Sequence, residues 1–377
     1  MILKQIKGQH FRNYSSFVFS PSPTNTIVVG DNGSGKTSLL EAIYLLGSGK
    51  SFRTSRLQHL LSRGAEVFYL HAQVQVHGVL HSLGVARERR AFTALRLNGE
   101  NISSLSTLAK VFPVQVFHSE STEIIYGAAE IRRRFLDWGL FHVEHEFHGL
   151  WKNLNKVLRQ RNELLKQVHL NPEEIKVWDE QLVQISDKIT GLRRKHLEHV
   201  EARFQALLGG VLGELDVRLV LHTGWPEGVD LSQGLKESFE VDRQRGFTSR
   251  GAHRADIRIT VDGVIAKEAL SRGQIKTLSM LLGLAQLEYL VEEKQLQPVV
   301  LVDDMAAELD ADHMGWLVEK LSQLNQQVIY TALTLEGLPR TLVDAQGSKV
   351  FHVEQGELKE CVQTEANINE GNNDARE

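Results

Sequence analysis

The sequence contains a single cysteine, Cys361, among 377 residues. One thiol excludes an internal disulfide and is typical of a protein from a reducing compartment, so we predict a cytoplasmic location. There is no stretch of about 18 uncharged apolar residues, and residues 1–8 lack the apolar core of a signal peptide. We therefore expect no membrane partner.

Positive charge does not predominate, because 43 Lys and Arg face 47 Asp and Glu for a formal net charge of −4. Any DNA contact must then come from local basic patches. Such patches occur at residues 87–90, 132–134, 193–195 and 243–254, and each could equally be a solvated face or pair with acids of the same lobe. The candidate DNA-binding residues are Arg132, Arg133, Arg250 and Arg254.

Glycine is locally abundant in one specific motif, Gly30-Asp31-Asn32-Gly33-Ser34-Gly35-Lys36-Thr37, which matches the phosphate-binding pattern G-x-x-x-x-G-K-[ST]. Residues 26–29 are typical of a buried strand, and residues 38–46 have helical apolar spacing. Backbone N–H groups and the helix N-terminus would bind phosphate. We expect these eight residues to bind ATP, with Lys36 on the β- and γ-phosphates and Thr37 on Mg²⁺.

A second motif is the apolar run 299–302 followed by Asp303 and Asp304. The run is typical of a buried parallel strand, and an α/β sheet binds ligands at the carboxyl ends of its strands. We expect Asp303 to hold Mg²⁺, directly or through water, and Asp304 to orient or deprotonate the attacking water.

A third motif is Leu270-Ser271-Arg272-Gly273-Gln274, which precedes an apolar helix pattern and offers a second N-terminus for an anion. Residues 307–310, Ala-Glu-Leu-Asp, follow the acidic pair. In this order the motifs resemble the ATP-binding-cassette ATPases. That resemblance implies ATP and Mg²⁺ as cofactors and an ATP-dependent homodimer, in which Ser271, Arg272, Gly273 and Gln274 contact the ATP held by the other copy.

The pattern of elements predicts an α/β fold with a helical second lobe. The resemblance implies that the head is of the ATP-binding-cassette type, a mixed sheet around the phosphate loop. We expect an N-terminal part of the head at 1–125, a helical lobe at 126–250, the rest of the head at 251–360, and a disordered tail at 361–377. Apolar residues within 150–168 and 178–207 predict an antiparallel helix hairpin, either packed on its own lobe or protruding as a coiled coil. Trp151 and Trp178 fit as its packing aromatics.

Four further segments, at 11–14, 49–54, 132–139 and 253–256, resemble the RecF family of bacterial recombination mediators. The resemblance covers nearly the whole chain, from Met1 to about Gly356. The resemblance implies that Arg12 approaches the nucleotide, that Arg53 lies near a phosphate, and that Gln115 is a catalytic lid-loop glutamine. It also implies a nucleoid-associated protein with a weak DNA-stimulated ATPase, which binds single-strand/double-strand junctions at DNA gaps. Such a protein works with RecO and RecR to load RecA during replication-linked repair and SOS induction.

The chain departs from the family pattern at His118-Ser119-Glu120, Ala129, Ala252 and residues 305–308, and Thr331 follows the strand after which the cassette switch histidine is expected. The sequence therefore does not identify which residue senses the γ-phosphate. Two alternative functions for the chain are an SMC-type DNA tether, which would need longer coiled coils, and a transporter ATPase subunit. His142, His145 and His148 could suggest a metal site, but we expect surface or core histidines.

Overall fold

The computed structural model describes residues 1–361 except 55, 90–92, 170 and 305–308. The chain forms two compact units, Met1–Ser119 with Gln297–Glu377, and Glu120–Leu296. The predicted boundary at 250/251 is wrong, because the helix that follows Ser271 packs against the long helix of the second unit. Arg90 and Glu308 lie outside the described residues, as does all of the predicted tail except Cys361, which ends a strand.

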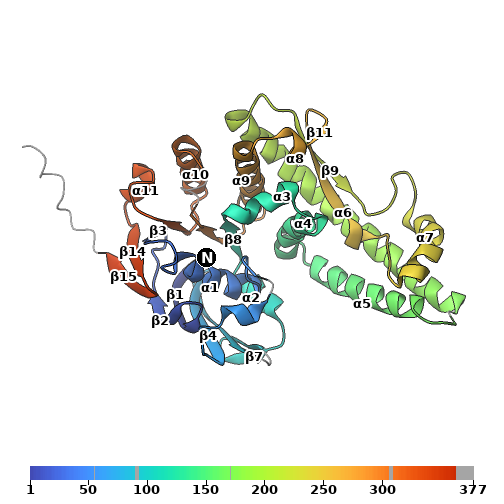
Figure 1. The fold of residues 1–377 in the computed structure, drawn as a ribbon, viewed down its shortest axis with the longest axis horizontal. Coiled ribbons are helices and arrows are strands. Elements are labelled where there is room, and N and C mark those ends of the chain that lie inside the picture. The colour runs from blue at the N-terminus through green and yellow to red at the C-terminus, as the bar shows by residue number, and fades with distance from the viewer. Residues whose placement is uncertain (55, 90–92, 170, 305–308, 362–377) are drawn as a thin grey trace, which may run out of the picture. The chain divides into compact units, whose positions relative to one another are not determined.

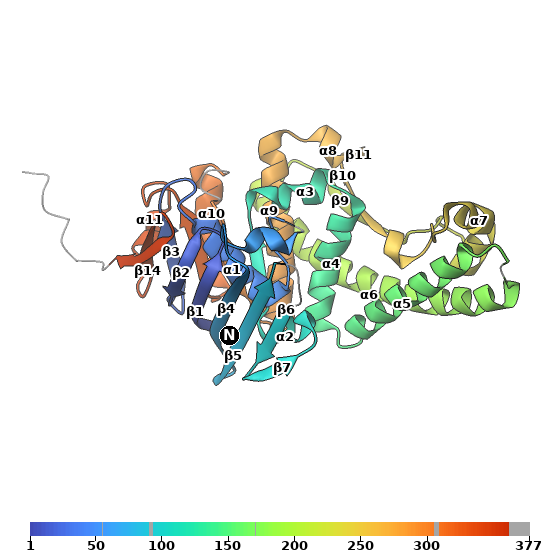
Figure 2. The ribbon, with the colours of Figure 1, turned by 60° about the horizontal axis from the view of Figure 1, so that its bottom comes forward.

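The first unit contains an antiparallel sheet in the order β2-β1-β4-β5-β6-β7, and Figure 2 shows β1, β4 and β5 side by side. Its Asn98-Gly99 hairpin turn was predicted, and both residues have the positive φ that such a turn requires. The strands are β1 (Ile2–Phe11), β2 (Tyr14–Phe19), β4 (Val67–Val76), β5 (Val79–Glu88), β6 (Thr93–Leu97) and β7 (Glu100–Ile102).

A second sheet of this unit has the order β15-β14-β3-β13-β12-β8, and all its neighbouring strands are parallel except β14 and β15. The strands are β3 (Asn25–Val29), β8 (Val114–Phe117), β12 (Val299–Val302), β13 (Val328–Ala332), β14 (Lys349–Glu354) and β15 (Glu357–Cys361). The predicted apolar strand before the acidic pair is thus confirmed. The carboxyl ends of β3, β13 and β12 meet at one edge, where such sheets bind ligands.

Helix α1 (Lys36–Ser48) contacts strands of both sheets, so the first unit has one continuous apolar core. Leu39, Leu40, Ile43 and Leu46 are fully buried in it. This burial makes α1 a rigid support for the loop that precedes it. The other helical elements of the unit are α2 (Leu105–Val111), α10 (Ala311–Gln323), α11 (Arg340–Val343) and the 3₁₀ turns Leu57–Leu60 and Ser119–Thr122.

The second unit is mainly helical, with a small antiparallel sheet in the order β11-β10-β9. Its helices are α3 (Glu123–Tyr126), α4 (Ala129–Val143), α5 (Phe147–Leu165), α6 (Pro172–Val211), α7 (Leu231–Arg245), α8 (Ala266–Ala269) and α9 (Arg272–Glu288), followed by a π-helical turn at Tyr289–Glu293. A 3₁₀ turn covers Ala252–Arg254, and the strands are β9 (Val217–His222), β10 (Asp256–Val261) and β11 (Val264–Ile265).

Helices α5 and α6 lie side by side as the predicted hairpin (Figure 1). Asn171 caps α6 by accepting the N–H of Glu173, and Pro172 occupies its first turn as expected. The 40 residues of α6 span about 60 Å, and α6 also packs against α4, α7, α9 and β9. The hairpin is therefore packed on its own unit. Trp178 packs in its core, whereas the prediction for Trp151 is wrong, because that side chain is 45% exposed.

No helix among the described residues combines the length and the apolar composition that a membrane crossing requires.

Candidate functional site

The phosphate loop runs from the end of β3 to the start of α1, as predicted. Gly30 and Gly35 have φ values of 153° and 129°, which side chains rarely adopt. A Cβ on Gly30 would lie 2.2 Å from the carbonyl oxygen of Val353, and one on Gly35 would lie 2.8 Å from the Tyr14 hydroxyl. Glycine at these positions thus lets the backbone pass close to its neighbours.

Neighbouring turns hold the carbonyl groups of the loop. The Asn13 amide donates to the Ser34 carbonyl at 2.7 Å, and the backbone N–H of Gly356 donates to the same oxygen at 3.0 Å. The Tyr14 hydroxyl donates to the Gly35 carbonyl at 3.0 Å. The sequence pattern pointed to the arginine of this segment and missed Asn13 and Tyr14, whose roles depend on contacts across the fold.

Lys36 is almost fully buried at the start of α1, and its ammonium donates to the carbonyls of Gly30 at 2.6 Å and Asp31 at 3.0 Å. Burial lowers the pKa of Lys36, and the nearby acids Asp304, Asp303 and Asp31 partly oppose that shift. The cation is therefore held within the loop by groups that a phosphate oxygen can replace.

The two predicted metal ligands meet in the structure. The Thr37 hydroxyl donates to Oδ1 of Asp303 at 3.0 Å, although the residues are 266 positions apart in sequence. Burial raises the pKa of Asp303, and hydrogen bonds from Thr331 and Thr37 partly oppose the shift. Hydroxyl and carboxylate oxygens are ligands that Mg²⁺ accepts, so this pair fits that ion.

The loop also fits an anion. Gly35 is the N-terminal cap residue of α1, and because it has no side chain it makes no capping hydrogen bond to the first turn of that helix. Within the described part of the chain, the Ser34 hydroxyl is buried and has no hydrogen-bond partner. A buried donor without a partner costs free energy, and a phosphate oxygen would supply one.

A buried carboxylate on α1, Glu41, organises the two arginines that the sequence places near the nucleotide. Arg12 donates through Nε and Nη2 to Glu41, each at 2.7 Å, and through Nη1 to the His59 carbonyl. Arg53 lies 4.0 Å from Glu41, and its charge slightly opposes the rise that burial causes in the pKa of Asp303. The signal that could have revealed Glu41 is a lone acid in the apolar run Leu39–Ile43.

Gln115 is not in a lid loop, so that part of its prediction is wrong. It lies inside β8, opposite Val300 of β12, two residues before the strand ends at Phe117. The next residue is His118, whose ring packs against Phe52 and whose pKa burial lowers to about 4. A contact between Gln115 and Mg²⁺ stays a prediction.

The signature segment begins helix α9, as predicted. Ser271 accepts the backbone N–H of Gln274 at 3.3 Å, and the Gln274 side chain accepts the N–H of Ser271 at 2.9 Å. This reciprocal pair is a capping box. Ser271, Arg272 and Gly273 are exposed, and a Cβ on Gly273 would meet nothing within 4 Å.

Of the four candidate DNA-binding residues, Arg132 is committed to internal contacts. It forms a two-pronged ion pair with Asp256 and donates through its remaining nitrogen to the carbonyls of Ile124 and Gly127, with a side chain 12% exposed. Every nitrogen of the guanidinium thus has an internal acceptor, and a DNA contact for Arg132 stays a prediction that these bonds do not favour. Arg133 donates to the Ala255 carbonyl at 2.6 Å.

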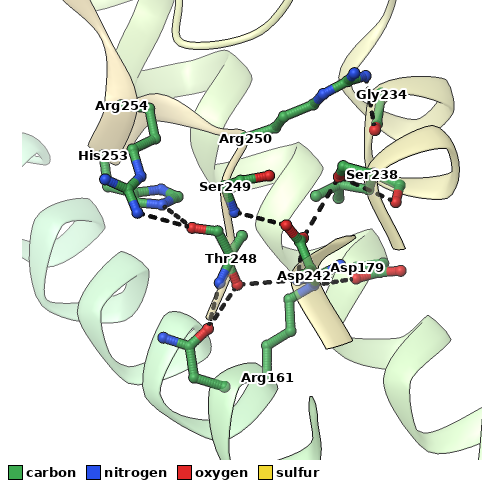
Figure 3. A network of polar contacts seen from close by, with 12 residues as sticks. Arg161, Asp179, Gly234, Ser238, Asp242, Thr248, Ser249, Arg250, His253 and Arg254 are labelled. Atoms are coloured by element: carbon green, nitrogen blue, oxygen red, sulfur yellow. Dashed lines mark hydrogen bonds and ion pairs between the residues drawn. The ribbon is translucent and has the colours of Figure 1, made fainter. Parts of the chain in front are cut away.

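Arg250 and Arg254 belong to the polar network of Figure 3. Arg250 donates to Gly234 and pairs with Glu237 at 2.9 Å, and Arg254 donates to the Thr248 carbonyl at 3.3 Å. The centre of this network is Arg161, fully buried, which pairs with Asp179 and Asp242 and donates to Thr248. For Arg133, Arg250 and Arg254, DNA binding stays a prediction.

The histidines of the suggestive His142–His148 segment have aromatic neighbours. His142 packs edge-on against Trp138 and Phe141, and burial lowers its pKa to about 4. In the described ranges, no three His, Cys, Asp or Glu side chains form a group that could hold a metal ion.

Comparison with known proteins places this architecture. Residues 2–359 match the family model of the RecF/RecN/SMC N terminal domain. The chain is 38% identical over 360 residues to the DNA replication and repair protein RecF of Haemophilus ducreyi, covering 95% of this chain and all of that one. It is 40% identical over 360 residues to RecF of Idiomarina loihiensis, covering 96% and 100%. This chain belongs to the RecF family.

Solved structures agree with the RecF assignment. The chain matches the recombination mediator RecF with ATP at a TM-score of 0.86 and 26% identity, covering 96% of this chain and 98% of that one. It also matches an SMC head domain derived from Pyrococcus furiosus at a TM-score of 0.56 and 16% identity, covering 96% of each chain, which shows a common fold. The predicted cassette-type ATPase head with a helical lobe is confirmed.

Proposed function

We propose that this RecF-family chain is an ATP-dependent DNA-binding protein of the RecFOR repair pathway, and that ATP hydrolysis acts as its switch. Its relatives are named for DNA replication and repair, and one solved relative is described as the RecF–ATP form in that pathway. The observation that carries the proposal is the meeting of Thr37 and Asp303 beside Lys36, because phosphoryl transfer needs these three groups together.

Each group has a role that its position supports. Lys36 and the N–H groups of residues 30–37 bind the phosphates, while Thr37 and Asp303 hold Mg²⁺, which when bound offsets phosphate charge. Asp304 follows Asp303 at the same sheet edge and is placed to orient or deprotonate the attacking water. Arg12 and Arg53, fixed by Glu41, support the nucleotide side of the loop.

The second half of the site comes from another copy of the chain. The exposed N-terminus of α9, with Ser271 and Gly273, offers donors to a γ-phosphate held by the partner copy. ATP binding then favours the dimer, and hydrolysis removes the anion that bridges the copies, so the dimer opens. We expect a weak ATPase that DNA stimulates.

The closed dimer binds DNA at single-strand/double-strand junctions in gaps and, with RecO and RecR, helps load RecA. Arg250 and Arg254 are the candidates for phosphate contacts in the basic segment 243–254. An SMC-type tether is disfavoured, because α6 packs against its own unit and does not extend as a free coiled coil.

Fluorescence anisotropy with gapped DNA, at moderate salt and with Mg²⁺, tests the proposal. ATP should tighten DNA binding at least about tenfold, the size of a typical allosteric coupling, and sedimentation should show dimers only with ATP. Equal DNA affinity with and without ATP would contradict the proposal. Lys36→Arg should impair hydrolysis while nucleotide still binds. Its matched control is Lys50→Arg, because Lys50 is an exposed lysine just beyond α1.

A further inference from the structure

Thr331 occupies a central place in the nucleotide-binding sheet. It is the fourth residue of β13, which lies between β3, the strand of the phosphate loop, and β12, the strand of the acidic pair. Its register partner on β3 is Val28, and the side chain is only 2% exposed. A buried hydroxyl here must find hydrogen-bond partners.

The Thr331 hydroxyl bonds to both members of the acidic pair. It donates to Oδ1 of Asp303 at 2.8 Å and accepts the backbone N–H of Asp304 at 2.9 Å. Only a side chain that both donates and accepts can make these two bonds at once, and its β-branched carbon restricts rotation about χ1.

Two consequences follow for the acidic pair. The hydroxyls of Thr37 and Thr331 both go to Oδ1 of Asp303, so Oδ2 is the carboxylate oxygen that receives neither. Asp304 has a φ of 52°, a left-handed conformation that non-glycine residues seldom adopt, and its N–H is held by Thr331 in that conformation. One side chain thereby sets the rotation of one acid and the backbone of the next.

We infer that Thr331 is a positioning residue for Mg²⁺-dependent ATP hydrolysis. This inference rests on the proposed function. Its hydroxyl occupies Oδ1 of Asp303, so that Oδ2 would be the oxygen available to Mg²⁺, and it holds the backbone from which the Asp304 side chain projects. In this role Thr331 acts through the two acids to which its hydroxyl bonds. The alternative is that Thr331 is a core residue whose hydroxyl contributes only to the stability of the folded state.

The chain offers a matched control in Thr26 on the adjacent strand β3. Thr26 is also fully buried, and its hydroxyl accepts a backbone N–H, that of Ser22, at 2.8 Å. Thr26→Val and Thr331→Val both remove a buried hydroxyl and leave a backbone N–H without its acceptor. Only the second removes a bond to the acidic pair.

The test compares wild type, Thr331→Val, Thr331→Ser and Thr26→Val in the full-length chain. Binding of a fluorescent ATP analogue is measured in EDTA and across a Mg²⁺ titration, beside kcat, KM and thermal unfolding. For Thr331→Val we expect unchanged affinity in EDTA, about a tenfold higher Mg²⁺ requirement and about a tenfold lower kcat, the size of one charge-assisted hydrogen bond. Thr331→Ser should stay within about twofold of wild type.

The outcomes separate the two ideas. If Thr331→Val loses only thermal stability, as Thr26→Val should, while wild type hydrolyses ATP with Mg²⁺, the positioning role is overturned and the proposed function stands. If wild type shows no Mg²⁺-dependent ATP binding, the proposed function fails and this inference with it. Thr331→Ala, which also lacks the hydroxyl and is less bulky, replaces the valine variant if that variant does not fold.

Discussion

Helices α1 and α9 both begin at segments predicted to bind phosphate, yet they satisfy their first N–H groups in opposite ways. The start of α1 has no side-chain cap and is preceded by a loop whose Ser34 and Gly35 carbonyls accept hydrogen bonds from Asn13 and Tyr14. The start of α9 is closed by its own capping box of Ser271 and Gln274. The first helix is built to receive an anion, whereas the second already uses two N–H groups, those of Ser271 and Gln274, in its own cap.

This difference matters for a switch. An anion at α1 satisfies donors that the chain leaves without side-chain partners, so its binding gains most of their hydrogen-bond free energy. At α9 the capping box already uses the N–H groups of Ser271 and Gln274, so an anion there gains only from the donors that the box leaves, and the net gain is smaller. In the proposed dimer, ATP would thus be held mainly by its own copy, and the contact with the partner copy would remain easy to break.

Lys36→Arg tests the α1 side and should have the largest effect. The longer, planar guanidinium cannot occupy the ammonium position near Gly30 and Asp31, so we expect ATP hydrolysis to fall on the order of 100-fold to 1,000-fold, as when a key charge-stabilising donor is removed. ATP should still bind. Steady-state ATPase assays against Lys50→Arg would measure this, and an unchanged kcat would contradict the role of Lys36.

Acid should weaken the attachment of α9 through His196, which lies 3.2 Å from the Gln286 side chain on that helix. Burial lowers the pKa of His196 to about 4, so below about pH 6.5 the unfolded chain takes up a proton that the folded chain excludes. The free energy of unfolding should therefore fall between about pH 6.5 and 4, by about 3 kcal/mol for this histidine.

Urea unfolding at several pH values would measure this fall. His196→Gln should flatten the pH profile, whereas the exposed His145→Gln should leave it unchanged. Part of the slope should persist, because burial also lowers to about 4 the pKa values of His118, His142 and His253. A profile with the same slope in His196→Gln would show that this histidine is not the group that titrates.

Ser271→Arg tests the α9 side. A bulky cation at the cap removes the capping hydroxyl and blocks the helix end, so turnover and ATP-dependent self-association should fall about tenfold to 100-fold. The affinity of the single copy for ATP should not change, because that binding depends on α1. Analytical ultracentrifugation beside nucleotide titration distinguishes the two effects, and unchanged turnover and association would show that the site is not shared between copies.

Tyr14→Phe should have the smallest effect. It removes only the hydrogen bond from the Tyr14 hydroxyl to the Gly35 carbonyl while keeping the ring in the core. We expect a loss of about 1 kcal/mol in ATP binding, or roughly fivefold in affinity. Isothermal titration calorimetry would measure it, with Tyr69→Phe, an exposed tyrosine on β4, as the control. Equal ATP affinities of Tyr14→Phe and wild type would mean that the hydrogen bond to the Gly35 carbonyl does not contribute to ATP binding.

The sequence predicted what depends on local pattern. The strand–loop–helix at Gly30–Thr37, the strand before Asp303 and the cap at Ser271 could each be read from neighbours in the chain, because glycine spacing, apolar runs and capping residues act over a few positions. The hairpin α5–α6 followed from its apolar periodicity and Pro172.

What the sequence could not give is pairing over long distances. Thr331 bonds to Asp303 and Asp304, Glu41 to Arg12, and Arg132 to Asp256, and none of these partners is identifiable from spacing. An arginine cluster has the same sequence pattern whether its charges face solvent or an internal acid, so the pairing of Arg132 with Asp256 could not be predicted. The domain boundary predicted at 250/251 is wrong for a similar reason. The residues of α9 do not indicate that this helix packs against α6.

The phosphate loop depends on residues from the far end of the chain. Gly30 donates its N–H to the Leu333 carbonyl, and Ser34 accepts the N–H of Gly356. A ribosome adding about 5–20 residues per second needs tens of seconds to travel from the first of these positions to the last. The nascent chain therefore carries its nucleotide motif long before these bonds can form, and products of messages truncated ahead of the final β-hairpin would lack the Gly356 bond to the loop.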